Sequence, residues 1–454
     1  MTALLPLAVP WLLTAVFLAL NGRSRWVSWA AVLVLACVVA ADIGLLLHQT
    51  IGAASPLDVV TGGWPRGVGV RLRVDTLSLF VAAISAGVLL AVTAHEARSQ
   101  VRSRLLPGLM VALCSGLHGA FFTADLFNFY VFFEVCVVSS FVLAAYGYGK
   151  RETRGTFVYV VVNSFGSVLF LLGVAAVYYV AGTLDIADLS ARGGKHSYWL
   201  AAVLVFAALA IKVGLFPFHG WVPVLYTHAR PAVAAALAGA LVTLGAYALL
   251  RLGFTVYDAE RAASSTVLVV LGSGAAFYGA ALAMSKKRPE EIAAYLAVAH
   301  SGYLVVALGV GGVHGMIAMV LGIAAGALDK AAMFLSLDSR TAARGRIVFI
   351  AVSSTAGMPL TLGFLFKIEL ILALLATDAA AVYLAMVLPS LIVLVGGAFV
   401  MWQRTGHGAH APKHPGRPWA AAALVASTLA LGAVPGPVQG AASSAAVHLI
   451  GGKP

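Results

Sequence analysis

The chain has 454 residues, of which 61% are hydrophobic and only 10% charged, and its mean hydropathy is +0.97. Soluble globular proteins carry about 25% charged residues, so this composition excludes a soluble enzyme, a disordered protein and a nucleic-acid-binding protein. The formal net charge of +12 can be interpreted only once the basic residues are placed along the chain. Cys37, Cys114 and Cys136 all stand in apolar runs, without the spacing of a metal site or a disulfide framework.

Apolar stretches separated by short charged loops predict an all-α, polytopic membrane protein, because a membrane-spanning helix needs about 20 apolar residues. The first helix is expected to be retained rather than cleaved as a signal peptide, since it has no basic start. A Gly-rich loop with Trp64 is expected between the second and third helices. In chain order, about fourteen helices are predicted at 3–20, 26–47, 77–94, 105–122, 126–146, 156–180, 198–221, 232–252, 266–284, 292–310, 316–335, 348–375, 379–402 and 419–434.

The distribution of lysine and arginine predicts the orientation of these helices. With the N-terminus outside, the loops after odd-numbered helices hold 18 of these residues, the opposite loops hold 8, and 3 lysines lie within helices. Cytoplasmic loops of membrane proteins are enriched in lysine and arginine. We therefore expect a multi-pass protein of the cytoplasmic membrane with both termini outside. Its positive charge then anchors it in the lipid bilayer and implies no nucleic acid partner.

Two predicted helices carry a proline close to a lysine, in opposite order. Lys212 precedes Pro217 in the seventh helix, whereas Pro359 precedes Lys367 in the twelfth. Proline breaks a helix, and inside a membrane a broken backbone is tolerated only where protein or water satisfies it. The seventh helix is expected to run inward and the twelfth outward, so the mirrored order is typical of inverted repeats. Prolines are also generally frequent in membrane helices, which is the simpler interpretation.

The predicted helices form one integral membrane domain, 1–454, with helices 7 and 12 broken. Its predicted parts are the first three helices (1–104), a first inverted five-helix repeat of helices 4–8 (105–252), a second repeat of helices 9–13 (266–402), and a C-terminal helix and tail (419–454).

Several titratable residues fall inside the predicted helices, where an ionised side chain costs roughly 2.5–3.5 kcal/mol. A buried lysine whose carboxylate partner approaches or recedes can take up and release a proton. A static Glu–Lys pair that locks two helices together is the alternative, but several such groups on successive helices favour a proton relay. The residues are Glu134, Lys212, Asp329, Lys330, Lys367 and Glu369, together with the histidines His118, His219 and His300.

Four stretches resemble one known family. ADLFNFYVFFEVCVVSSFVLAAYG (124–147) resembles the helix-five signature of the proton-conducting membrane transporters, 211–251 and 292–309 are similar to their helices seven to eight and ten, and RLRVDTLSLF (71–80) is similar to their run into helix three. This family includes the antiporter-like subunits of respiratory complex I, the subunits of Mrp-type multisubunit Na+/H+ antiporters and their relatives in membrane-bound hydrogenases. The chain looks most like the D-type subunits of Mrp antiporters.

The resemblance implies a fourteen-helix fold with two inverted repeats and a proton relay. In the family pattern, Glu134 matches the glutamate that modulates the helix-seven lysine, Lys212. Other membrane subunits are implied as partners and protons and Na+ as the transported ions, with no cofactor or metal in this chain. The remaining relay positions are Lys330, Lys367, His219 and His300, and the candidate modulators are Asp329, Glu369, His228 and His118.

The chain also departs from the family pattern. Thr243 stands where the family usually has a lysine in helix eight, and a threonine cannot hold a proton. Thr243, His228 or water are the candidates to bridge this gap. Gly326 stands where helix eleven usually has a histidine, and Asp329 is an addition beside Lys330.

Three functions remain open on the sequence alone. The first is a subunit of a cation/proton antiporter, and the second is a proton-pumping subunit of an NADH:quinone oxidoreductase or a membrane-bound hydrogenase. The third is a non-pumping scaffold subunit, suggested by Thr243. In each case we expect a transporter-like subunit rather than a catalytic one, because the chain has no nucleotide-binding Gly-rich loop after a strand and no clustered cysteines.

Overall fold

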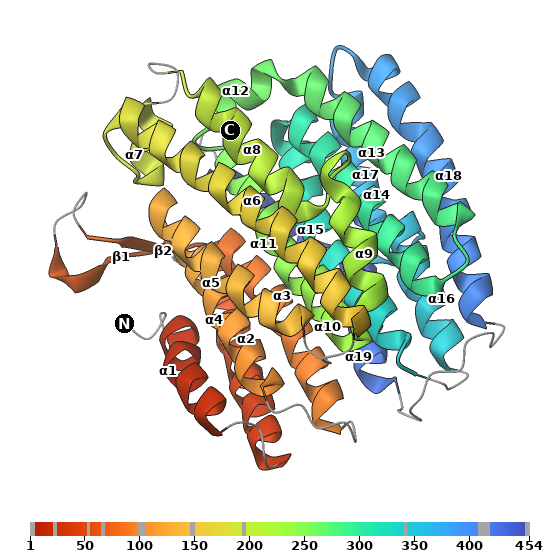
Figure 1. Cartoon of the computed structure of the whole chain (residues 1–454). Coiled ribbons are helices and arrows are strands. Elements are labelled where there is room, and N and C mark those ends of the chain that lie inside the picture. Colours follow the sequence, from red (N-terminus) through yellow and green to blue (C-terminus); the bar gives the residue numbers. More distant parts are fainter. Residues whose placement is uncertain are drawn as a thin grey trace.

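The computed structural model describes residues 5–20, 25–51, 55–64, 69–98, 105–145, 150–192, 197–339, 343–406 and 418–449. Most of these residues lie in helices packed side by side (Figure 1). The α-helices are α1 (Leu5–Leu20), α2 (Arg25–Ile51), α3 (Thr76–Arg98), α4 (Leu106–Phe122), α5 (Leu126–Ala144), α6 (Lys150–Ala181), α7 (Ile186–Arg192), α8 (Trp199–Val213), α9 (Trp221–His228), α10 (Pro231–Ala236), α11 (Val242–Gly253), α12 (Asp258–Ala263), α13 (Ser265–Ser285), α14 (Pro289–Val310), α15 (Gly312–Ser336), α16 (Ala343–Ala356), α17 (Leu362–Leu375), α18 (Ala380–Gly406), α19 (Trp419–Ala433) and α20 (Pro435–Leu449).

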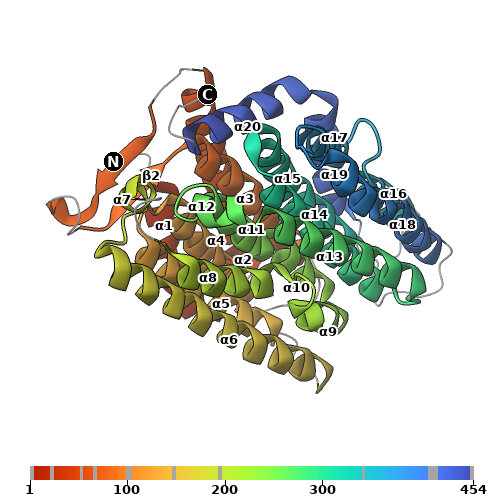
Figure 2. The same ribbon diagram turned by 90° about the horizontal axis from the view of Figure 1, so that it is seen from above.

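The predicted all-α polytopic fold is confirmed. Within the described ranges, ten helices or joined helices are long and apolar enough to cross a membrane, and the bent pair α19–α20 makes eleven if it counts as one span. The shorter apolar helices α1 and α4, together with the broken pair α16–α17, account for the other predicted spans. Helix α15 is at the centre: its apolar segment is entirely buried, and the view from above places it among other helices (Figure 2).

Small residues let the central helices approach closely. A Cβ at Gly279 of α13 would lie 2.5 Å from the backbone nitrogen of Ala299, and one at Gly302 of α14 would lie 2.5 Å from that of Ala276. In a membrane, where helices gain little from burying apolar surface against each other, such close packing is a main source of association. The glycines of α13 and α14 therefore hold the second half of the chain together.

The predicted break in the seventh helix is confirmed. Helix α8 ends at Val213, Gly214 caps it in the left-handed conformation with φ of 68°, and α9 begins only at Trp221. Pro217 lies between them, after a cis peptide bond. A short 3₁₀ turn, η3 (Phe218–Gly220), fills the rest of the break.

The predicted break in the twelfth helix is also confirmed. Helix α16 ends at Ala356 and α17 begins at Leu362, with Pro359 between them and Gly357 at φ of 90°. Lys212 lies one residue before the end of α8, whereas Lys367 lies in the second turn of α17. The two lysines thus lie on opposite sides of their breaks along the chain. That the two five-helix segments are inverted repeats stays a prediction.

Two segments in the first half differ from the sequence-based expectation. The loop expected around Trp64 contains an antiparallel hairpin, β1 (Leu57–Val60) and β2 (Arg71–Val74), which projects from the bundle in Figure 1. Arg71 binds both Asp58 and Asp185, so an ion-pair network, rather than strand propensity alone, fixes these four-residue strands. The predicted eighth helix is interrupted by a π-helical segment, η4 (Leu237–Leu241).

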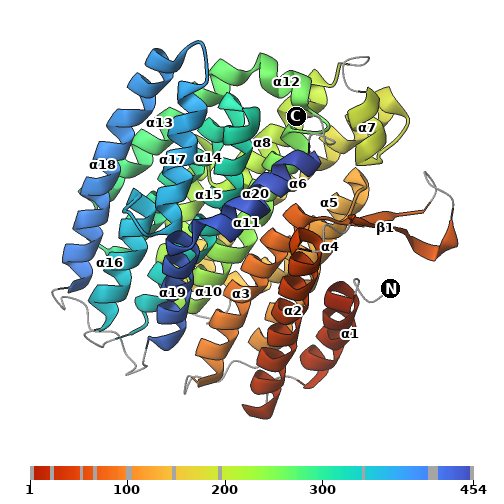
Figure 3. The same cartoon turned by 180° about the vertical axis from the view of Figure 1, so that it is seen from behind.

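The third difference is at the C-terminal end. We expected one helix over 419–434 followed by a tail. Instead, α19 ends at Ala433 and α20 continues at an angle of 83°. Pro435 starts α20, as is common for proline in a first helical turn. Figure 3 shows α20 crossing the bundle, where it packs on α3 and α15.

A buried ion pair joins the start of α3 to the end of α11. Asp75 caps α3: its carboxylate accepts from the backbone N–H of Ser78, whose hydroxyl accepts from the backbone N–H of Asp75. Arg251 donates to the same carboxylate at 2.7 Å and to the hydroxyl of Tyr247, which in turn donates to the carbonyl of Phe121. Burial raises the pKa of Asp75, but the charge of Arg251 and the Ser78 N–H hold it below its ordinary value.

We predict that Arg251→Met lowers the free energy of unfolding by about 3 kcal/mol, because it leaves the buried carboxylate of Asp75 with only the longer, 3.8 Å contact to Arg73. The matched control is Asp258→Asn, which breaks the Arg261–Asp258 pair, where the Asp258 side chain is 57% exposed. The control should cost about 1 kcal/mol or less. Thermal unfolding of the purified protein checks both, and equal effects of the two substitutions contradict the prediction.

Candidate functional site

Lys212, at the end of α8, is buried and has only uncharged partners. Its ammonium group donates to the carbonyl of Asn163 at 3.1 Å and to the hydroxyl of Ser167 at 3.3 Å, both on α6. The nitrogen also lies 4.6 Å from the centre of the Phe133 ring. Because these partners are dipoles and an aromatic ring rather than a carboxylate, they stabilise the charged ammonium group less strongly. Lys212 can therefore lose its proton more easily than a lysine in an ion pair.

Glu134, on α5, lies beyond ion-pair distance of Lys212. Among the described residues it forms no ion pair with Lys212, and its Oε1 is buried without a hydrogen-bond partner. It lines a cavity of about 530 Å³ between α1, α4 and α5, beside Thr14, Ser115 and Ser139. That Glu134 controls Lys212 stays a prediction, and in this conformation such control would require more than a direct ion pair.

The break after Lys212 is satisfied by a neighbouring helix. Because Pro217 has no N–H, it cannot donate to the carbonyl of Val213 four residues earlier. The hydroxyl of Ser301, on α14, donates to that carbonyl at 2.6 Å. Ser301 directly follows His300 in the chain, so the second half of the protein stabilises the broken helix of the first half. Sequence reasoning did not identify Ser301.

The two candidate histidines near this break have local partners. His219 lies 3.2 Å from the hydroxyl of Tyr278 and packs on Phe216. His228, at the end of α9, has its Nδ1 2.6 Å from the carbonyl of Val224 in its own helix. The hydrogen-bond partners of Lys212 in the described part of the chain are on α6 and include neither histidine.

Thr243 lies on α11, directly after the π-helical segment. It is 3% exposed, and its hydroxyl donates to the carbonyl of Gly239 in its own helix at 2.6 Å. Two residues on, a Cβ at Gly245 would lie 3.3 Å from that of Lys212, so α11 packs directly on α8 here. At the middle of the predicted relay, α8 and α11 are thus tightly packed, and the hydroxyl of Thr243 already has a hydrogen-bond partner.

The absence of a side chain at Gly326 provides the space for the ring of His300. Nε2 of His300 lies 2.9 Å from the carbonyl of Gly322 on α15, and because a carbonyl only accepts, Nε2 carries a proton. A Cβ at residue 326 would lie 2.2 Å from this nitrogen. The departure from the family pattern at Gly326 therefore makes the space that the His300 ring fills.

Lys330 and Lys367 lie near this ring. The nitrogen of Lys367 is 3.3 Å from the centre of the Tyr303 ring and 4.5 Å from that of Phe366. It is buried and has no hydrogen-bond partner among the described residues. Lys330 is 5% exposed. As for Lys212, no carboxylate lies within ion-pair distance of either lysine in the described ranges.

The remaining modulators lie apart from these lysines. Glu369 pairs with His314 at 2.8 Å, and the side chain of His314 is 48% exposed. His118 and Asp42 form a completely buried pair at 2.9 Å between α4 and α2. The other ring nitrogen of His118 faces the carbonyl and the thiol of Cys114 in its own helix. Asp42 was visible in its apolar run, and we overlooked it.

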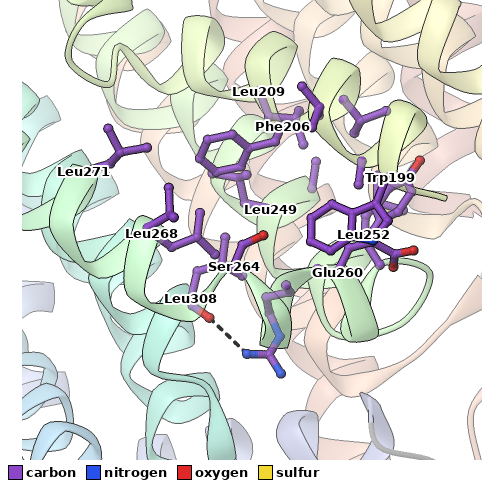
Figure 4. A pocket seen from close by; sticks show the side chains of 18 residues that line it. Trp199, Phe206, Leu209, Leu249, Leu252, Glu260, Ser264, Leu268, Leu271 and Leu308 are labelled. Atoms are coloured by element: carbon purple, nitrogen blue, oxygen red, sulfur yellow. Dashed lines mark hydrogen bonds between the residues drawn. The ribbon is translucent and has the colours of Figure 1, made fainter. Parts of the chain in front are cut away.

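An apolar cavity of about 210 Å³ lies elsewhere, between α8, α11 and α13. Figure 4 shows Phe206, Leu249 and Leu268 around it. Arg261, which also lines the cavity, donates to the carbonyl of Leu308 at 3.3 Å. It contains none of the predicted relay residues. Among the described residues, no group of three or more His, Cys, Asp or Glu side chains could hold a metal ion.

Comparisons with known proteins identify the family. A family model described as NADH:quinone oxidoreductase/Mrp antiporter, TM, matches residues 123–347. The D-type subunit of the Na(+)/H(+) antiporter of Alkalihalophilus pseudofirmus is 31% identical over 362 residues, which cover 74% of this chain and 73% of that protein. The chain belongs to the NADH:quinone oxidoreductase/Mrp antiporter family.

Two further matches span more of the chain. The N-type subunit of the NADH-quinone oxidoreductase of Desulforudis audaxviator is 29% identical over 429 residues, 87% of this chain and 85% of that protein. A chain of the Mrp complex from Dietzia sp. DQ12-45-1b superposes with a TM-score of 0.88 at 26% identity, over 99% of this chain and 97% of that one. The family resemblance drawn from the sequence is confirmed.

We predict that Ser301→Ala lowers the free energy of unfolding by about 1–3 kcal/mol, because the buried carbonyl of Val213 loses its donor. Ser273→Ala on α13 is the control, since its buried hydroxyl has no partner among the described residues. That change should lie within about 0.5 kcal/mol of the wild type. Thermal unfolding of the two variants distinguishes these outcomes. If Ser301→Ala is as stable as the wild type, Ser301 does not have the role described here.

Proposed function

We propose that the chain is the D-type membrane subunit of a multisubunit monovalent cation/proton antiporter in the cytoplasmic membrane, with both termini outside. The observation that carries the proposal is the pair of buried lysines, Lys212 and Lys367, each next to a proline-containing helix break and each without a carboxylate within ion-pair distance in the described ranges. The antiporter relatives and the excess of basic residues in one set of loops support it. Na+ is the expected cation and other membrane subunits are the expected partners.

In this proposal the buried groups carry a proton in stages. Lys212 takes a proton under the influence of Glu134 and passes it toward α15, and Lys330, His300 and Lys367 continue the path. Transfer past Thr243 requires water or a movement of side chains, because its hydroxyl is bonded to Gly239. The helix breaks give the lysines polar backbone surroundings inside the membrane.

A second candidate is a proton-pumping subunit of a redox complex. It is favoured by the relative from the NADH-quinone oxidoreductase, which matches 87% of the chain. A non-pumping scaffold is the third candidate, favoured by the packed contact at Thr243. The redox candidate requires partner subunits that carry the redox centres, so the composition of the native complex separates it from the first.

We predict that Lys212→Ala in the assembled complex lowers Na+-driven proton movement in membrane vesicles by about 100-fold or more, the range typical of a lost proton-transferring group. Lys287→Ala is the matched control, because Lys287 is an exposed lysine between α13 and α14, and it should leave transport unchanged. Equal assembly of both variants is checked by purification of the complex. Full transport by Lys212→Ala favours the scaffold.

A further inference from the structure

Asp329 on α15 is a buried acidic residue that forms no ion pair within 4 Å in the described part of the chain, although Lys330 and Lys367 are near enough to interact with its charge. It is 2% exposed, and its Oδ1 accepts from the hydroxyl of Thr428 on α19 at 3.1 Å. Its Oδ2 is buried without a hydrogen-bond partner, and the carboxylate forms no ion pair among the described residues. Lys330 is the next residue in the chain, but adjacent side chains on a helix do not face each other.

Oxygen atoms surround this carboxylate. The side chains of Ser354 and Thr355, in the last turn of α16, lie beside it together with Thr428. Because Pro359 has no N–H, the carbonyl of Thr355 also lacks the donor that a continuous helix supplies, and no other donor to it is found within the described ranges.

The two helix breaks differ in whether the carbonyl left without its helical donor has another partner. At the first break, Ser301 donates to the carbonyl that Pro217 leaves without a partner. At the second break, the equivalent carbonyl belongs to Thr355, a residue whose side chain lies beside Asp329. The break loop is tightly held, since a Cβ at Gly432 of α19 would lie 2.3 Å from the carbonyl carbon of Thr361. The loop of the second break is therefore fixed against α19, the helix that carries Thr428.

An unpaired carboxylate in a membrane protein interior is costly, and a bound proton or cation removes that cost. Divalent ions prefer several carboxylates, and transition metals prefer sulfur and nitrogen ligands. In transporters, Na+ is coordinated by backbone carbonyls at the ends of broken helices. A single carboxylate with hydroxyl oxygen atoms beside such a break suits a monovalent cation better than a divalent ion or a transition metal. The charged groups nearby, Lys330 and Lys367, oppose a second positive charge.

We propose that Asp329, with Thr428, Ser354 and Thr355, forms a site that holds either one proton or one small monovalent cation such as Na+. Cation binding at this site releases the proton of Asp329 and disfavours protons on Lys330 and Lys367. By reciprocity, protonation of these lysines weakens cation binding by the same factor. The role in exchange rests on the proposed antiport function, whereas binding itself does not.

The test is Na+ binding by the purified complex in detergent, measured as proton release with a pH-indicator dye when NaCl is added, against choline chloride. The wild type should release a proton with saturable dependence on Na+. Asp329→Asn should abolish this release, and Thr428→Val should raise the half-saturating Na+ concentration about tenfold, the equivalent of one lost hydrogen bond. Asp258→Asn, an exposed carboxylate on α12, is the control.

Two results overturn the site: wild-type proton release by Asp329→Asn, or an unchanged half-saturating concentration in Thr428→Val. Thr428→Val keeps the test decisive if Asp329→Asn does not assemble. Transport is measured separately in vesicles. Na+-dependent proton release without antiport supports the site and contradicts the proposed function, whereas antiport with no proton release on binding contradicts the site alone.

Discussion

The proposed function depends on two lysines, Lys212 and Lys367, that are buried inside a membrane protein without a carboxylate within ion-pair distance. A buried charge is retained only where nearby dipoles replace water. Lys212 has a backbone carbonyl and a hydroxyl of α6, and Lys367 has the face of the Tyr303 ring. These partners stabilise the charged form less strongly than a carboxylate does, so protonation can change without breaking a strong ion pair.

The helix breaks place these lysines and tie the two halves of the chain together. Ser301 of α14 bonds the backbone exposed at the first break, and Gly245 allows α11 to lie directly on α8. The helix that carries Lys212 is therefore in direct contact with the helices that carry Thr243 and His300. The second break instead leaves oxygen atoms next to Asp329, which makes the two halves chemically different.

Much of this architecture could be predicted from the sequence, but not the partners of its buried groups. The long apolar stretches identified the spans, and the prolines beside Lys212 and Lys367 identified both breaks. The partners Asn163, Ser167 and Tyr303 come close only through the angles at which helices pack. Gly326 stands where the family usually has a histidine, and only the structure shows that the His300 ring fills the space beside it, because a motif match does not contain side-chain direction. The bend before α20 was missed because the alanine-rich tail lacks a strong apolar signal.

The central claim is that Lys212 and Lys367 change protonation during transport and are not fixed charges. The most direct measurement is cation-driven proton flux through the reconstituted complex with either lysine replaced by arginine, which keeps the positive charge but cannot lose its proton in a protein. The account predicts that Lys212→Arg and Lys367→Arg each abolish the flux although the complex assembles. Flux at the wild-type level in either arginine variant would contradict it.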